Sequence, residues 1–195
     1  MARTSAPLYS EDHIRQGGPS NATFQHSFSR HYASADNAIG ATGVVHSTFC
    51  PIQPGDIINN ITFCTGGTAA TAPTAGFVAI YSSAGALLGQ SADFGSTARA
   101  ANTAYTIPLV TAITMASGPS STSCVYIAIS VTATVVPTIR GLTVGNAVMG
   151  GTLGITSPST PRILAQTHGS AVGAVAPATI ASPTTVATVN FYILT

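Results

Sequence analysis

Short runs of apolar residues, several of them alternating with polar ones, fill the chain from about Thr42 to its end. The clearest runs cover residues 44–52, 57–64, 77–81 and 125–131. Each run has the length of a β-strand and is too short for a typical amphipathic helix. Val, Ile and Thr are frequent in them and Leu is scarce, which favours strands because β-branched side chains fit a pleated surface. The pattern predicts an all-β chain.

Turn signals separate these runs at a spacing of roughly ten residues, as in many all-β domains. Residues Gln53–Asp56 read Gln-Pro-Gly-Asp, and Ser82–Gly85 links the run 77–81 to a short run at 86–89 as a hairpin. Further strands are expected at 105–109, 113–115 and 186–194. This order of short strands and turns predicts a single β-sandwich or jelly-roll-like domain.

Two runs predict how their strands are buried. The run 57–64 alternates as a strand with one buried face does, and that face is expected to carry Ile57, Ile61 and Phe63. The run 125–131 is apolar at both alternating sets of positions. A strand covered on both faces has this composition, so 125–131 is expected at the centre of a sheet.

The first 36 residues differ from the remainder. Residues 1–36 are polar and show no sustained period, apart from a short helix expected at Ser10–Gln16. We therefore expect an extended N-terminal arm at 1–36 and a β-sandwich domain at 37–195, with long loops and weak strands within 140–185. Aromatic side chains dominate many interfaces, and the candidate assembly residues of the arm are Tyr9, Phe24, Phe28 and Tyr32.

The composition indicates that neighbouring subunits cover much of the surface. Hydrophobic residues make up 45% of the chain, enough for a sizeable core, whereas charged residues make up only 6%. An average soluble protein has roughly 25% charged residues. Because net charge keeps free molecules apart, so few charges are typical of a subunit that is covered by its neighbours in an assembly. A neutral secreted domain covered by Thr and Ser is the alternative interpretation.

Charge and hydropathy also bear on partners and location. The net charge is +1 and the six Arg residues are scattered, whereas nucleic-acid binding requires clustered positive charge. No apolar stretch reaches the roughly 20 residues of a membrane helix, and the N-terminus lacks a hydrophobic signal region. We expect a protein that is made in a cytoplasm, binds no nucleic acid and does not insert into a membrane.

The residues needed for catalysis are scarce. Lys is absent, which excludes phosphate-binding loops of the Gly-Lys-Ser/Thr type and Schiff-base chemistry. Glu11 is the one Glu, and the domain contains only Asp56 and Asp93 as acids, so a pair of facing glycosidase carboxylates is not expected. Residues 89–93 begin like a nucleophile elbow, but Asp93 replaces its closing Gly. The sequence predicts no enzyme and no cofactor.

Cysteine and histidine residues do not form a motif either. Cys50, Cys64 and Cys124 cannot all pair within one chain, and their apolar surroundings indicate buried free thiols, with a Cys50–Cys64 bridge as the alternative. No spacing supports a Cys–His nucleophile. His26 and His31 are too far apart for one face of a strand or helix. No metal site is predicted, although one shared between subunits at a symmetry axis stays open.

The order of four segments resembles a known class of modules. Residues 54–63, 77–89, 101–109 and 125–129 together resemble the β-sandwich modules in minor tail, tail-fibre and other virion proteins of tailed bacteriophages, especially those of actinobacteria. The resemblance covers about residues 42–132. It implies a structural protein of the virion, assembled in the host cytoplasm, that packs as a homo-oligomer with capsid or tail subunits. It supplies no catalytic residues.

Two questions stay open after this resemblance. The module stands almost alone in this chain, so a capsid decoration protein is an alternative to a tail protein. The chain could also be a module that binds a host-surface receptor or glycan, for which Tyr81 and Tyr105 are the candidate contacts. Trp, which is frequent in sugar sites, is absent, and a core or cross-strand role is the expected one for both tyrosines.

Overall fold

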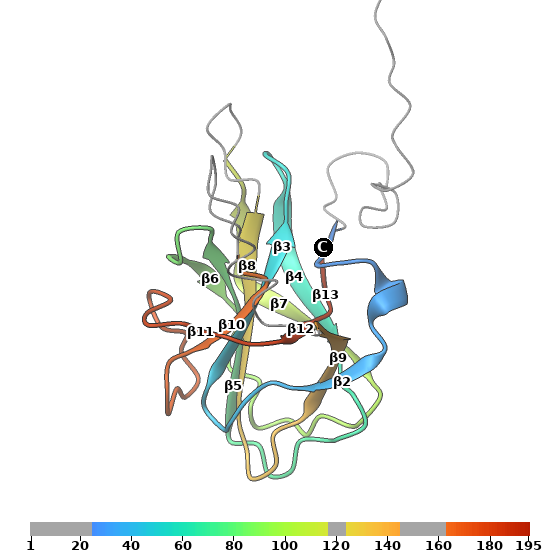
Figure 1. Ribbon diagram of the computed structural model, residues 1–195. Helices are drawn as coiled ribbons and strands as arrows, with labels where there is room; N and C mark the ends of the chain where they lie inside the picture. Colours follow the sequence, from blue (N-terminus) through green and yellow to red (C-terminus); the bar gives the residue numbers. More distant parts are fainter. Residues whose placement is uncertain (1–24, 117–123, 145–162) are drawn as a thin grey trace, which may run out of the picture.

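The strands of the protein form three antiparallel sheets (Figure 1). The structure is a computed structural model and describes residues 25–116, 124–144 and 163–195. In these ranges nearly all regular structure is β, with one short 3-10 turn at Arg30–Tyr32. The prediction of an all-β sandwich fold is confirmed.

The largest sheet has six strands in the order β11-β10-β3-β8-β5-β6. Its central strand β8 (Cys124–Thr132) pairs with β3 (Val45–Pro51) on one side and with β5 (Ala75–Ser82) on the other. The flanking strands are short: β6 (Leu87–Gln90), β10 (Ala165–His168) and β11 (Thr184–Thr185). Since β8 is buried along almost its whole length, its central position, predicted from apolar residues on both faces, is confirmed.

Two smaller sheets complete the fold. The four-stranded sheet has the order β1-β13-β4-β7, and the three-stranded sheet the order β12-β9-β2. Their bounds are β1 (Gln25–His26), β13 (Tyr192–Leu194), β4 (Ile57–Cys64), β7 (Ala104–Thr114), β12 (Thr188–Asn190), β9 (Thr138–Thr143) and β2 (Ala35–Ala38). An isolated bridge between Ser91 and Leu109 joins β7 to the chain just after β6, so β7 is only partly open along its outer edge.

The main core lies between the six-stranded and four-stranded sheets. It joins side chains such as Ile61 and Phe63 of β4 to Ile127 and Ile129 of β8, and Ile139 of β9 closes one end. All five of these side chains are at most 1% exposed. Burial of this apolar surface contributes most of the free energy that holds the two sheets together.

A second apolar cluster covers the opposite face of the six-stranded sheet. Phe77 and Tyr81 of β5 and Tyr126 of β8 pack there against a loop at residues 169–183. The loop contributes Val172, Ala176 and Ile180. The six-stranded sheet is therefore buried on both faces, which is the physical reason for the continuous apolar runs in β5 and β8.

Strand β4 shows where simple alternation fails. Its register shifts between Ile58 and Asn60, as at a β-bulge, and both Asn59 and Asn60 donate their backbone N–H to Thr195 O at 2.7 Å. A bulge adds one residue and reverses which side chains point inward. Ile58 is therefore fully buried, whereas Ile57, expected on the buried face, is 36% exposed.

Other boundaries differ from the predicted ones in similar ways. The expected strands at 105–109 and 113–115 form the single strand β7. The expected strand at 186–194 is divided at Phe191 into β12 and β13, which belong to different sheets. β9 was not predicted as a strand. Of the region 140–185, where weak strands and long loops were expected, the described residues 163–185 contain the short strands β10 and β11 and the loop between them, and residues 145–162 lie outside the described residues. The helix expected at 10–16 lies outside the described residues.

The folded part of the chain begins earlier than the predicted boundary at residue 37. Gln25 and His26 pair with β13, and Asp36 lies within β2 opposite Arg140. Residues 25–26 and 35–36 therefore belong to the sheets, and the 3-10 turn lies on the connection between them. The arm expected at 1–36 can comprise at most the residues before β1, and residues 1–24 lie outside the described ranges.

Candidate functional site

The acidic residues that the structure describes hold loops in place. The Asp56 carboxylate accepts a hydrogen bond from Gln53 N at 2.9 Å, and the Asp93 carboxylate accepts from Gly76 N and Gly95 N at 2.9 and 2.8 Å. In residues 25–116, 124–144 and 163–195, no group of three or more His, Cys, Asp or Glu side chains is placed to hold a metal ion.

The segment that begins like a nucleophile elbow, residues 89–93, starts in β6 and continues into a loop, and Ser91 is its one buried residue. Ser91 is fully buried, its Oγ donates to Ala92 O at 2.8 Å, and Val78 N donates to Ser91 Oγ at 3.1 Å. The segment leaves β6 and does not enter a helix. The Ser91 hydroxyl therefore donates one hydrogen bond within the loop and accepts one from β5.

A buried serine and histidine, not noticed in the sequence, lie side by side in the six-stranded sheet. Ser47 Oγ and His168 Nε2 hydrogen-bond each other at 2.9 Å, and the two residues are 0% and 4% exposed. The His168 ring also meets the Tyr81 ring edge-on, with 5.4 Å between the centroids. Burial lowers the pKa of His168 to about 4, so this imidazole is neutral at pH 7.

A larger buried polar network surrounds His46, which precedes Ser47 in β3 and therefore points to the opposite face of the strand. Asn190 Nδ2 donates to His46 Nδ1 at 3.2 Å, so Nδ1 is unprotonated and Nε2 carries the proton that is donated to Thr188 Oγ1 at 3.1 Å. Asn37 Nδ2 donates to Asn190 Oδ1 at 3.3 Å. Burial lowers the pKa of His46 to about 4. The network joins β3, β12 and β2, and burial keeps the His46 imidazole neutral at pH 7.

An open pocket of about 450 Å³ lies near the 3-10 turn. We call it the arginine pocket. Its volume lies within the range of small-molecule sites. It contains two guanidinium groups, polar side chains from two loops and a thiol, and its lining residues are Arg30, Ala33, Cys64, Thr65, Asn102, Thr103, Ala104, Arg140 and Phe191.

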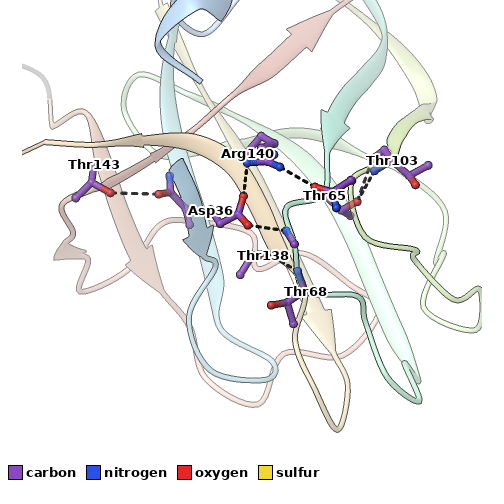
Figure 2. Close-up of polar contacts among 10 residues, drawn as sticks. Asp36, Thr65, Thr68, Thr103, Thr138, Arg140 and Thr143 are labelled. Atoms are coloured by element: carbon purple, nitrogen blue, oxygen red, sulfur yellow. Dashed lines mark hydrogen bonds and ion pairs between the residues drawn. The ribbon is translucent and has the colours of Figure 1, made fainter. Parts of the chain in front are cut away.

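Arg140 is held firmly in this pocket. Its Nη1 forms an ion pair with Asp36 Oδ1 at 2.7 Å across β2 and β9, and its Nη2 donates to Asn102 Oδ1 at 2.6 Å. Figure 2 shows Arg140 between Asp36 on one side and the loops that carry Thr65 and Thr103 on the other. These contacts leave three of the five guanidinium N–H groups for other acceptors.

The loop after β4 packs closely against the same ion pair and hydrogen-bonds to it. Gly67 N donates to Asp36 Oδ2 at 2.6 Å, and Thr65 Oγ1 donates to Ala100 O at 2.6 Å. A Cβ atom at Gly66 would lie 2.6 Å from Asp36 Oδ1, closer than real Cβ contacts allow. Asn102 adopts a left-handed conformation with φ of 52°, which Asn tolerates better than most residues. The walls of the pocket therefore require a residue without a side chain at Gly66 and the left-handed conformation of Asn102.

Cys64 is the thiol of the arginine pocket. The three cysteines are free thiols, which settles the alternative of a Cys50–Cys64 bridge. Cys50 and Cys124 are buried as expected, whereas Cys64 is half-buried. Burial raises the pKa of the Cys64 thiol, and the nearby Arg140 charge offsets part of this increase. Burial also raises the pKa of Cys50.

We predict that Cys64 alone reacts readily in the folded protein. Iodoacetamide should modify one thiol per chain under native conditions and all three in denaturant, because Cys50 and Cys124 are only 0% and 7% exposed. The rate should keep increasing above pH 9, since the pKa of Cys64 is raised. Mass spectrometry of the alkylated protein measures both the number of modified thiols and the rate of modification. A Cys64→Ser variant that still contains one rapidly reacting thiol would show that this assignment is wrong.

The predicted assembly aromatics have different environments. Phe28 is half-buried and meets the Phe191 ring edge-on with 5.4 Å between centroids, whereas Tyr32 is 67% exposed at the end of the 3-10 turn. Tyr9 and Phe24 lie outside the described residues. Tyr32 is therefore the aromatic side chain of this set that is available to another molecule in the described structure.

The predicted receptor contacts are integrated into the fold. Tyr81 is fully buried, and its hydroxyl donates to Pro177 O at 2.9 Å; burial raises its pKa to about 12. Tyr105 is half-buried, accepts a hydrogen bond from Ala100 N at 2.7 Å, and has the Arg99 guanidinium 4.8 Å above its ring. Both tyrosines thus have the core or cross-strand roles that the sequence favoured, and Tyr81 has no exposed surface for a receptor.

The outward face of the four-stranded sheet is the other notable surface. β4 and β7 contain no charged residue and no His. Thr62 of β4 is directly opposite Ile193 and Thr106, and the two threonine hydroxyls hydrogen-bond each other at 2.7 Å. Val110 of β7 is 70% exposed. These residues form a two-strand-wide uncharged face of Thr, Asn and apolar side chains.

No protein-family model and no curated protein sequence matches the chain. Among the described residues, no helix has the length and apolar character needed to cross a membrane. The function is therefore inferred from the residues and surfaces described above.

Proposed function

We propose that this chain is a structural component of a bacteriophage virion, either a minor tail protein or a capsid decoration protein. It acts by packing against copies of itself and against other virion subunits. The observation that carries the proposal is the uncharged face of the four-stranded sheet, formed by β4 and β7. The order of β-sandwich segments that resembles phage virion modules supports the same function.

The uncharged face favours assembly for a physical reason. Long edge strands of soluble proteins normally carry charged residues, Pro or bulges that prevent pairing with other chains. β7 has eleven residues and no charge, and its interruptions are Pro108 and the register irregularity that follows it. With charged residues at 6% of the chain, little electrostatic repulsion opposes the close approach of another subunit. A face of this kind is expected to be covered in the working protein.

The polar side chains described above support a structural role over an enzymatic one. Asp56, Asp93 and Ser91 hold loops, and His46 and His168 are buried and neutral at pH 7. A general base must reach its substrate and titrate near the working pH. Neither histidine meets these two conditions.

A truncation tests the proposed assembly role. Deleting residues 2–24 removes the segment before β1 and leaves all described strands intact, so the domain should keep its thermal unfolding temperature. Its incorporation into particles, measured by quantitative mass spectrometry of purified virions, should decrease at least tenfold. A full-length Tyr32→Ser variant should also be incorporated less, because Tyr32 is 67% exposed and aromatic anchors dominate interfaces. Its decrease should be smaller than that of the truncated chain, because only one side chain is changed.

The matched control is Val175→Ser, which changes a residue that is 70% exposed on the loop 169–183 and belongs to neither the 3-10 turn nor β4 and β7. This variant should be incorporated at the level of the unmodified chain. Normal incorporation of the truncated chain would show that the segment before β1 does not contribute to assembly.

A second function, binding of a host-surface glycan, is favoured by one specific observation. The arginine pocket has the volume of a ligand site and contains Arg30 and Arg140, two of the three arginines that the structure describes. The pocket adjoins the uncharged face, since Cys64 of β4 and Ala104 of β7 line it. A virion protein can combine both functions, because Arg30 and Arg140 of the pocket lie outside these two strands.

A further inference from the structure

We propose that the arginine pocket binds a small anionic sugar, with Arg30 and Arg140 recognising its carboxylate or phosphate group. The proposal deepens the glycan-binding function and does not depend on where in a particle the protein resides. It rests on the charges, the hydrogen-bonding groups and the size of the pocket.

The charge distribution around the pocket favours an anion. Arg140 is neutralised by Asp36 at 2.7 Å. Arg30 is exposed and has no ion pair with a described carboxylate, since Asp56 and Asp93 lie in other loops. Counted over the described residues, the pocket therefore carries an excess positive charge, in a chain whose net charge is only +1. Planar guanidinium groups match carboxylate and phosphate oxygens well.

The binding geometry of Arg140 exists before a ligand arrives. Asp36 and Asn102 fix two of its nitrogen atoms at 2.7 and 2.6 Å, and the loop containing Gly66 and Gly67 closes around the carboxylate of Asp36. A side chain that is already ordered loses little conformational entropy on binding. Arg140 can thus act as a fixed donor, and the exposed Arg30 side chain can close over the ligand.

The remaining lining residues indicate a ligand with hydroxyl groups. A pocket of about 450 Å³ is larger than a bare acetate or phosphate ion requires. Asn102 and Thr103 line it with hydrogen-bonding side chains, and Ala33, Ala104 and Phe191 contribute apolar surface. The pocket therefore suits a compact molecule that carries hydroxyl groups, apolar C–H groups and one anionic group.

Titrations of the purified full chain test this proposal. The probes are glucuronate, glucose 6-phosphate, glucose and acetate, at ionic strength matched with sodium chloride and followed by ¹H–¹⁵N NMR. At least one of the two anionic sugars should shift resonances of Asn102, Thr103 and Cys64 with a dissociation constant in the millimolar range. Which of them binds more tightly distinguishes a carboxylate from a phosphate source. Glucose and acetate should bind at least about tenfold more weakly, because glucose lacks the anionic group and acetate lacks the hydroxyl groups.

Variants of Arg30 separate a specific site from general attraction of anions. Arg30→Gln should weaken binding about tenfold through loss of one charge-assisted contact, whereas Arg30→Lys should keep part of the affinity. Tyr32→Gln, on the same 3-10 turn, is the matched control and should bind like the unmodified chain. Binding that is unchanged in Arg30→Gln, equal for glucose or acetate, or absent for both anionic sugars would overturn the proposal. None of these outcomes depends on particle incorporation, so the assembly role is tested separately.

Discussion

Lowering the pH from 7.5 to 5 should decrease the free energy of unfolding by about 4 kcal/mol, because two buried histidines stay neutral in the folded protein. Burial lowers the pKa of His46 and of His168 from 6.5 to about 4. Between these pH values the unfolded chain binds protons that the folded chain does not. The stabilisation is fully present above pH 6.5 and is lost as the pH falls toward 4. Urea unfolding at a series of pH values measures it.

A single variant separates the contribution of one histidine. His168→Gln does not titrate, and the Gln amide can still hydrogen-bond Ser47, so the decrease between pH 7.5 and 5 should be about half as large. His46 should then account for the remaining half. Equal free energies of unfolding at pH 7.5 and 5 in the unmodified chain would contradict the buried, neutral state of both imidazoles.

Gly141→Ala should destabilise the protein by about 3 to 5 kcal/mol or prevent folding. Gly141 lies in β9, and a Cβ atom there would collide with Asn37 Nδ2 and Val189 O. Asn37 Nδ2 donates to Val189 O at 3.0 Å, so the added methyl group takes the place of this buried hydrogen bond. Two buried polar groups would lose their partners, and the network around His46 would be disturbed. Chemical denaturation measures the change.

Gly173→Ala is the matched control for this substitution. A Cβ atom at Gly173 has no neighbour within 4 Å, and the residue is exposed on the loop 169–183. The free energy of unfolding should change by less than about 0.5 kcal/mol. A Gly141→Ala protein as stable as Gly173→Ala would show that β9 does not pack between β2 and β12 as described.

Local chemistry explains the features that could be predicted from the sequence. The turn at Gln53–Asp56 has Gly55 at φ of 83° and Gln53 N bonded to the Asp56 carboxylate at 2.9 Å. The hairpin at Ser82–Gly85 has Gly85 at φ of 85° and Gly85 N bonded to Ser82 O at 2.9 Å. These turns depend on neighbouring residues only, so their residue types were sufficient.

Features that depend on pairing between distant strands could not be predicted. The bulge in β4 moved Ile57 outward, because Thr195 O accepts from two successive backbone N–H groups. The network around His46 needs Asn190, which lies 144 positions further along the chain. Arg140 meets Asp36 only through the register of β2 and β9. Nothing in the local sequence specifies these registers, and the arginine pocket was missed for the same reason.

The uncharged face and the buried polar network suggest a division of roles within the sandwich. The polar groups around His46 and Asn37 are enclosed and fix how the three-stranded sheet sits against β3. The face of β4 and β7 is open and carries no charge. We infer that specificity of the fold lies inside the domain, whereas contacts with other subunits use the outside of the four-stranded sheet.

Cryo-electron microscopy of purified virus particles that carry this gene tests the central proposal most directly. We expect density for the β-sandwich on the particle, with the face of β4 and β7 against another subunit. Density repeated over the capsid lattice would identify a decoration protein, and density at the tail would identify a minor tail protein. Absence of the chain from purified particles would contradict the proposed virion function.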